Sequence, residues 1–170
     1  MVAGFALASV LLVGCGTETV SGEAVGASGS ASAGSGPVDG CAVLPDEALV
    51  AAGFDPSKKM APDEEHEGWA GCIISGDGVS LMTALTNMTM DEVRSDRGIT
   101  DQVDVSVAGR IAVQHRRRAT AIEDSCILAF DTSEGVMMLR LERKVSNPEK
   151  PDMCGSLSER AVHLVPFIPA

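Results

Sequence analysis

The chain of 170 residues is about as long as one folded domain, and a hydrophobic content of 45% is enough to form a core. Acidic side chains outnumber basic ones by 24 to 13, and the net charge of −11 has the wrong sign for binding nucleic-acid phosphates. Aromatic residues make up only 3% of the chain, which leaves few rings on which bases could stack. We therefore expect no nucleic-acid partner.

An apolar run occupies residues 2–14 and ends at Cys15. It has the length of a signal peptide and is shorter than the roughly 20 residues that a membrane-spanning helix needs, although no Lys or Arg precedes it. The sequence Leu12-Val13-Gly14-Cys15 resembles the lipobox of bacterial lipoproteins, in which the chain is cut before the cysteine and the thiol is acylated. We therefore predict a signal peptide at residues 1–14 and lipidation at Cys15. The alternative is a buried element that happens to end in cysteine.

Glycine, serine and alanine dominate residues 15–40, which cannot bury enough apolar surface to fold and are interpreted as a tether. Every Lys and Arg lies after this segment, yet residues 41–170 remain acidic overall. An acidic domain is not attracted to an anionic membrane surface, so the lipid on Cys15 would hold it at the extracytoplasmic face of the cell membrane.

Residues 41–170 are predicted to form a single domain. Pro45 and two acidic residues begin a short helix that Gly53 ends, and residues 57–68 are charged and loop-like. A helix is predicted at residues 90–97 and another from a capping box at 156–159, with strands at 69–75, 79–85, 103–107, 111–115, 126–130 and 136–143. This order predicts an α+β fold, in which an antiparallel sheet of about five or six strands is covered by the N- and C-terminal helices.

Four cysteines lie in this domain, without CxxC spacing and with only three histidines in the chain. This pattern disfavours zinc and thioredoxin-type sites, and we predict no metal and no cofactor. In an exported protein an even number of cysteines indicates two disulfides, for which three pairings remain open. Free thiols are the alternative.

Several positions together resemble a known family. They are Asp39-Gly40-Cys41 before a short helix, Cys72 in the first strand, Gly109 before a strand, Cys126 in a central strand, and Asp152-Met153-Cys154 at the start of the last helix. With the lipobox, they resemble the actinobacterial exported lipoproteins classed as domain of unknown function 3558, over residues 39–165. The resemblance implies an exported location and a sheet-and-helix sandwich, and it implies no particular activity.

Of the three pairings, we prefer Cys41–Cys72 and Cys126–Cys154. Each pair is adjacent in the sequence and would tie a terminal helix to the sheet. Each closed loop is near 30 residues long, which contributes roughly 3–4 kcal/mol in the chain-entropy account.

Four features are candidate functional sites. The first is Arg116, Arg117 and Arg118, which could bind a phosphate or carboxylate or could simply be an exposed strand end. The second is His115, which continues the inward phase of its strand and, like His163, is interpreted as a hydrogen-bonded core or edge histidine. The acidic run 63–67 fits a solvated surface better than a cation site. The fourth is a set of methionines that could fill either the core or an adaptable groove: Met82, Met88, Met90, Met137, Met138 and Met153.

The sequence contains no GxSxG, Walker A, GxGxxG or HExxH motif. We therefore expect a lipid-anchored binding or scaffolding module of the cell envelope, whose partners are the membrane, an envelope protein or an anionic ligand. A carrier of a lipid or small hydrophobic ligand and an envelope hydrolase are the alternatives, and binding is favoured over catalysis.

Overall fold

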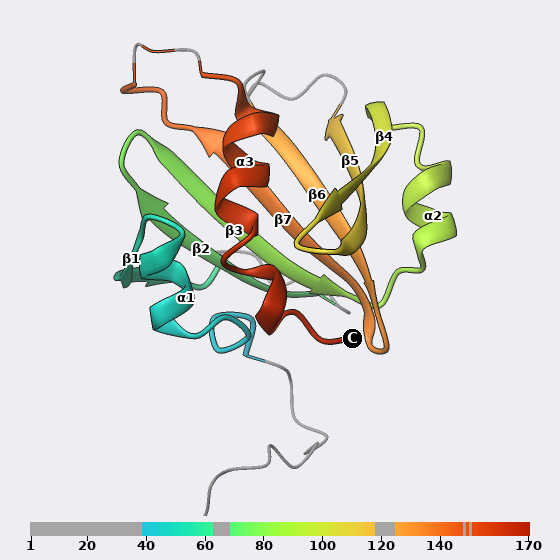
Figure 1. Ribbon diagram of the computed structural model, residues 1–170, viewed down its shortest axis with the longest axis horizontal. Helices are drawn as coiled ribbons and strands as arrows, with labels where there is room; N and C mark the ends of the chain where they lie inside the picture. The colour runs from blue at the N-terminus through green and yellow to red at the C-terminus, as the bar shows by residue number, and fades with distance from the viewer. Residues whose placement is uncertain (1–38, 63–68, 118–124, 148, 150) are drawn as a thin grey trace, which may run out of the picture. The chain divides into compact units, whose positions relative to one another are not determined.

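Seven antiparallel strands form one sheet in the computed structural model, which describes residues 39–62, 69–117, 125–147, 149 and 151–170 (Figure 1). Their order in the sheet is β1-β2-β3-β7-β6-β5-β4, so β7 is inserted between β3 and β6. The strands are β1 (Phe54–Met60), β2 (Trp69–Gly76), β3 (Val79–Thr86), β4 (Ile99–Val107), β5 (Arg110–Arg117), β6 (Ser125–Thr132) and β7 (Gly135–Arg143). The predicted class, an antiparallel sheet with a few helices, is confirmed.

The predicted number of strands was too low because β1 was missed. Its second half falls in the segment 57–68 that was expected to be a loop. Within the strand, Pro56, Lys58 and Lys59 interrupt any apolar alternation. The strand lies at the edge of the sheet, and its register with β2 shifts between Phe54 and Lys59. Prolines, charges and bulges are common on edge strands because they discourage pairing with another chain. The same residues break the alternation of apolar and polar side chains by which a strand is recognised in a sequence.

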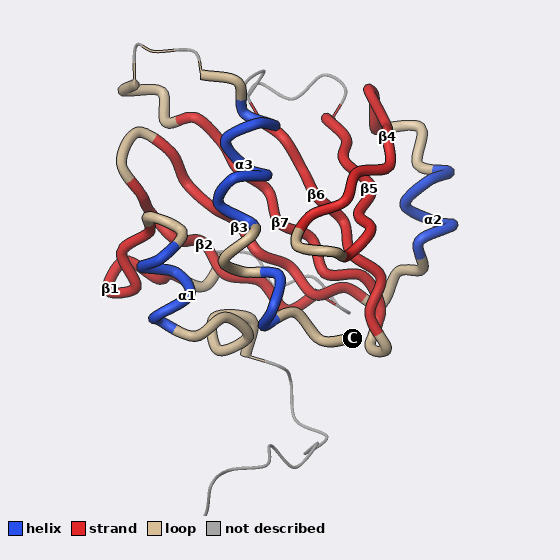
Figure 2. The backbone as a smooth tube through the Cα atoms, viewed as in Figure 1, coloured by secondary structure: helices blue, strands red, loops and turns tan. Residues whose placement is uncertain are grey.

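Two helices, α1 (Asp46–Ala51) and α3 (Met153–Ala161), lie over one face of the sheet, followed by the short 3₁₀ helix η1 (Val165–Phe167) (Figures 1 and 2). The start of α1 after Pro45 and the positive φ of 81° at Gly53 agree with the predicted boundaries. The capping box predicted at residues 156–159 is wrong, because α3 begins earlier. Asp152 is its N-cap and accepts a hydrogen bond from the Cys154 backbone N–H at 3.1 Å.

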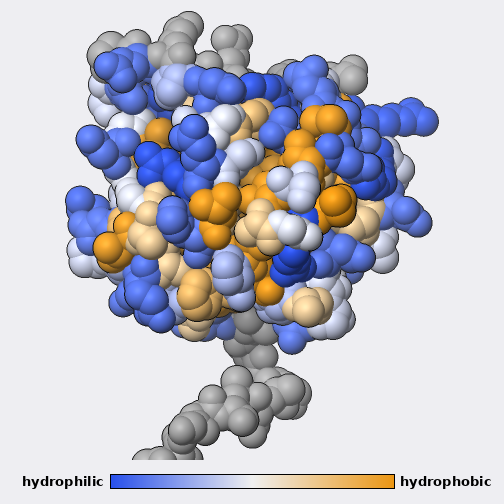
Figure 3. All heavy atoms as spheres, in the orientation of Figure 1, coloured by the Kyte–Doolittle hydropathy of each residue, from blue (hydrophilic) through white to orange (hydrophobic). Residues whose placement is uncertain are grey.

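The main core lies between these helices and the sheet. Alternate residues of β3, β7 and β6 point toward α3, among them Leu81, Leu139 and Leu128, and all three are fully buried. From the helix side, Leu49 of α1 and Leu157 of α3 complete this cluster. Apolar side chains nevertheless reach the surface on this side of the molecule, interspersed with hydrophilic ones (Figure 3).

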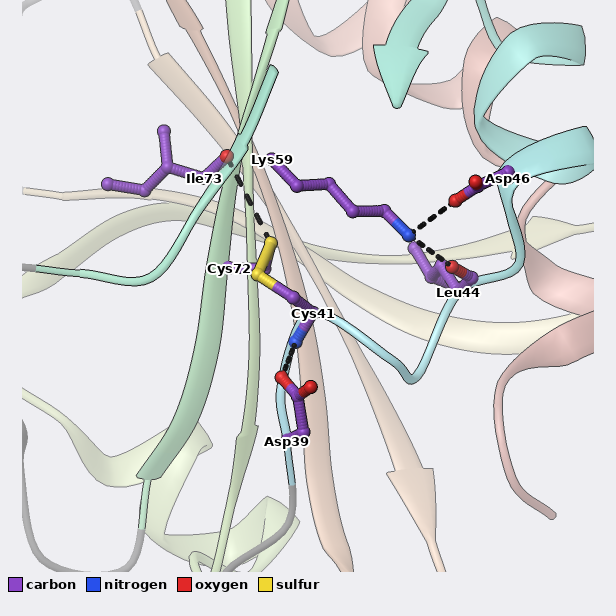
Figure 4. The surroundings of a disulfide bond; sticks show 7 residues. All are labelled: Asp39, Cys41, Leu44, Asp46, Lys59, Cys72 and Ile73. Atoms are coloured by element: carbon purple, nitrogen blue, oxygen red, sulfur yellow. Dashed lines mark hydrogen bonds and ion pairs between the residues drawn. A yellow bond between two sulfur atoms is a disulfide. The ribbon is translucent and has the colours of Figure 1, made fainter. Parts of the chain in front are cut away.

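Both predicted disulfides are present. Cys41–Cys72 joins the segment before α1 to β2, and Cys126–Cys154 joins β6 to the first turn of α3. Near the first disulfide, Lys59 of β1 donates to the Leu44 carbonyl at 3.3 Å and pairs with Asp46 at 2.7 Å (Figure 4). The edge strand is thus held to α1 by polar contacts next to a covalent link.

The third helix, α2 (Met90–Ser95), packs on the opposite face of the sheet. Its capping box is formed by Thr89 and Glu92, with the Thr89 backbone N–H donating to the Glu92 carboxylate at 2.7 Å. Val93 is the buried residue of the helix and joins a small cluster with Val113 of β5 and Ala129 of β6. Because α2 is only six residues long, it covers a small part of this face.

Candidate functional site

A cavity of about 150 Å³ lies on the face of the sheet that α2 partly covers. Successive side chains of a strand point to opposite faces of the sheet, so the strand residues that line the cavity alternate with those of the main core. Its walls combine apolar side chains, including the three methionines Met82, Met88 and Met138, with a few charged or polar groups. The lining residues are Trp69, Met82, Ala84, Met88, Val93, Asp96, Ile99, His115, Arg117, Ile127, Met138 and Arg140.

The strand register brings distant parts of the chain together on the cavity floor. Met82 pairs with Arg140, Arg140 with Ile127 and Ile127 with His115, so these four residues form one row across β3, β7, β6 and β5. In the neighbouring row, the small side chain of Ala84 lies beside Met138. The alanine at this position leaves room for the hollow.

His115 is the unusual residue of the cavity. It is only 2% exposed, and neither of its ring nitrogens has a hydrogen-bond partner among the residues that the structure describes. Burial lowers the pKa of the His115 imidazole below its ordinary value, and this effect is larger than the opposing effects of the Arg116 backbone and the Asp96 carboxylate. The ring is therefore neutral at pH 7. A neutral imidazole has one donor and one acceptor, and within the described residues neither forms a hydrogen bond of normal geometry. The expectation of a buried histidine is confirmed, whereas the expected hydrogen bond is not found in this part of the chain.

Arg140 is the second group with an unused polar atom. Its Nε is buried and has no partner in the described part of the chain, while its terminal Nη2 forms an ion pair with Glu142 at 2.5 Å. The side chains of Arg140 and Glu142 are only 20% and 18% exposed. On the other side of the cavity, Arg117 pairs with Asp96 at 3.8 Å. Each cation at the cavity therefore has a carboxylate beside it.

The comparison with known families gives one match. A family model described as "Protein of unknown function (DUF3558)" matches residues 10–166, which is most of the chain. The chain belongs to the DUF3558 family. Comparisons of the DUF3558 chain with curated proteins and with solved structures found no match.

The arginines singled out in the DUF3558 sequence do not form one patch where they are described. Arg116 and Arg117 are neighbours at the end of β5, so their side chains project from opposite faces of the sheet. Arg116 donates to the Ser125 carbonyl at 3.1 Å and lies 4.0 Å from Asp101, whereas Arg117 lines the cavity. Arg118, like Cys15, lies outside the described residues.

The six methionines lie in different places. Met137 and Met153 are buried in the main core, Met90 packs against the small cluster under α2, and Met82, Met88 and Met138 line the cavity. The role of core filler is therefore confirmed for Met137 and Met153, and the adaptable groove stays a prediction.

A larger, polar groove of about 860 Å³ lies near the β2–β3 turn. Two of its lysines are engaged with groups of the protein: Lys144 donates to the Gly76 carbonyl at 2.8 Å, and Lys58 pairs with Asp55 of the same strand at 3.1 Å. The first contact stabilises the turn. The smaller cavity with its unused polar atoms is the better candidate site.

Two further predictions concern metals and membranes. Among the described residues, no group of histidine, cysteine and carboxylate side chains is arranged to hold a metal ion, and the acidic run 63–67 lies outside them. In the same part of the chain, no helix is both long and apolar enough to span a bilayer.

Proposed function

We propose that the protein is a carrier or binding module that holds a small, largely apolar molecule in the cavity lined by Trp69, Ala84 and His115. The observation that supports this function is the cavity itself, whose walls are mostly apolar and include a few convergent polar groups. This combination is typical of small-molecule binding sites. The three methionines in its wall can repack around ligands of different shape.

The size of the cavity limits the ligand. An apolar cavity of about 150 Å³ accommodates a molecule of roughly the size of benzene. The ligand is therefore a small molecule, or the end of a longer one that extends through the partly exposed side of the cavity.

The cavity favours binding over hydrolysis among the functions that the sequence left open. A nucleophile–base pair is recognised by a hydroxyl or thiol bonded to the base. Within the described residues, both nitrogens of His115 lack such a partner. The buried imidazole has the properties of a group that recognises a ligand.

We further propose that the carrier is lipid-anchored at Cys15 on the extracytoplasmic face of the cell membrane. The apolar run before Cys15 and the lipobox-like sequence support this location. Two disulfides are typical of a protein that folds in an oxidising compartment. A carrier in this position would present its ligand close to the membrane.

Filling the cavity tests the binding function. Trp69 lines the cavity and is the only tryptophan in the chain, so its fluorescence reports on the site. Toluene should change the Trp69 emission of the wild type and should not do so in Ala84→Leu, because the added side chain occupies the cavity. Ala51→Leu makes the same change at an exposed position of α1 and should respond like the wild type. A toluene response that survives in Ala84→Leu would contradict the proposal.

A further inference from the structure

The unused polar atoms of the cavity specify the hydrogen bonds that a ligand must make. The neutral His115 ring offers one donor and one acceptor, and Arg140 Nε–H offers a second donor. Buried polar groups without partners are costly, so a ligand that satisfies them gains affinity over one that does not. Its polar part must both accept and donate.

His115 and Arg140 lie on either side of Ile127 on the cavity floor. The register places them across β5, β6 and β7, and both residues line the cavity. Two strand spacings separate their backbones by roughly 10 Å. A ligand placed above Ile127 would therefore have one of these residues on each side.

The charges around the cavity disfavour an ionic ligand. Arg140 is neutralised by Glu142, and Arg117 by Asp96. An anionic or cationic group would enter a largely buried site without a free counter-ion, which is unfavourable. The expected anionic ligand therefore fits this cavity less well than a neutral one.

We infer that the ligand is a neutral molecule with an apolar body of about the size of benzene and one group that both donates and accepts a hydrogen bond, such as an alcohol or a primary amide. This inference rests on the proposed carrier function and specifies its ligand class.

The test compares probes that share one ring. Toluene, benzyl alcohol, benzamide, benzoate and benzylamine are titrated against the full chain at pH 7.5, with Trp69 fluorescence and calorimetry as readouts. Benzyl alcohol and benzamide should bind about tenfold more tightly than toluene, because they form one or two net hydrogen bonds in a buried site. Benzoate and benzylamine should bind more weakly than the neutral polar probes.

Variants show whether the preference comes from His115. In His115→Leu, the ratio of benzamide to toluene affinity should fall several-fold, with Arg140 Nε–H as the remaining donor, whereas His163→Leu, at an exposed position after α3, should keep the wild-type ratio. Equal binding of toluene and benzamide to the wild type, or tightest binding of benzoate, would overturn the inferred ligand class and leave the carrier function in place. If no probe binds, the carrier function fails, and the ligand class fails with it.

Discussion

Replacing His115 with leucine should stabilise the ligand-free protein. The imidazole is buried, and both of its nitrogens lack hydrogen-bond partners within the described residues, whereas leucine has a similar volume without polar atoms. An unsatisfied buried polar group costs roughly 1–3 kcal/mol, so His115→Leu should raise the free energy of unfolding by about that amount near neutral pH. For a domain of this size, each kcal/mol should raise Tm by roughly 3–5 °C.

The gain should increase as the pH falls. The charged groups that face His115 are Asp96, Arg117 and Arg140, and burial lowers the pKa of the imidazole in the folded state. Below the unfolded-state pKa of about 6.5, the unfolded chain binds a proton that the folded protein does not bind until its own lower pKa is reached. The free energy of unfolding of the wild type therefore falls over this interval, by at most about 1.4 kcal/mol per pH unit from this residue. His115→Leu has no imidazole to protonate, so its free energy of unfolding should not show this decrease.

Urea unfolding monitored by Trp69 fluorescence at pH 7.5 and pH 5.0 measures both effects. His163→Leu is the matched control, because His163 is exposed and its replacement should change stability by less than about 0.5 kcal/mol. A His115→Leu variant that is less stable than the wild type at both pH values would show that the imidazole makes favourable contacts in the folded state, and our account of the cavity would be refuted.

Three further predictions address the anchor, the disulfides and a turn. Cys15→Ala should move the protein from the membrane fraction to the soluble or secreted fraction, and unchanged partition would argue against lipidation. Replacing both cysteines of Cys126–Cys154 with alanine should lower the free energy of unfolding by about 3–4 kcal/mol, measured by urea unfolding, since a loop of this length is no longer closed. Gly135→Ala should lower the free energy of unfolding by at least about 2 kcal/mol more than Gly109→Ala. Both glycines have a positive φ, but only at Gly135 would the new Cβ collide with the Thr86 carbonyl oxygen. Equal losses of stability for the two glycine variants would contradict the last prediction.

The helices and inner strands could be predicted from local patterns. In β7, Met137, Leu139 and Leu141 alternate with other residues, and the structure places all three in the main core. The edge strand β1 could not be recognised because it contains a proline and two lysines. These residues suit the edge of a sheet, where they prevent pairing with another chain, but they interrupt the apolar alternation that predicts a strand. For α3, the family resemblance placed Asp152-Met153-Cys154 correctly at the start of the helix. The capping box at 156–159 was wrong because Asp152 caps the helix one turn earlier.

The cavity could not be predicted because it depends on the strand order. Trp69, His115 and Arg140 line one hollow only because β7 lies between β3 and β6, and the alternation within each strand carries no information about that order. One signal was present in the sequence: Arg140 is a charged residue within the apolar segment 136–141. A charge in a central strand requires either a partner or a site, and here it has both an ion pair with Glu142 and an unused Nε.

The Cys41–Cys72 disulfide also determines how mechanical force would enter the domain. Tension applied through the chain before Cys41 passes across the sulfur bridge into β2, in the sheet, without pulling on α1 or β1. The chain between the two cysteines, whose positions are 31 apart, is about 100 Å long when extended and is released only if the bridge is reduced. A domain pulled by its N-terminal segment would therefore be loaded through its sheet, while the edge strand and its helix remain under no tension.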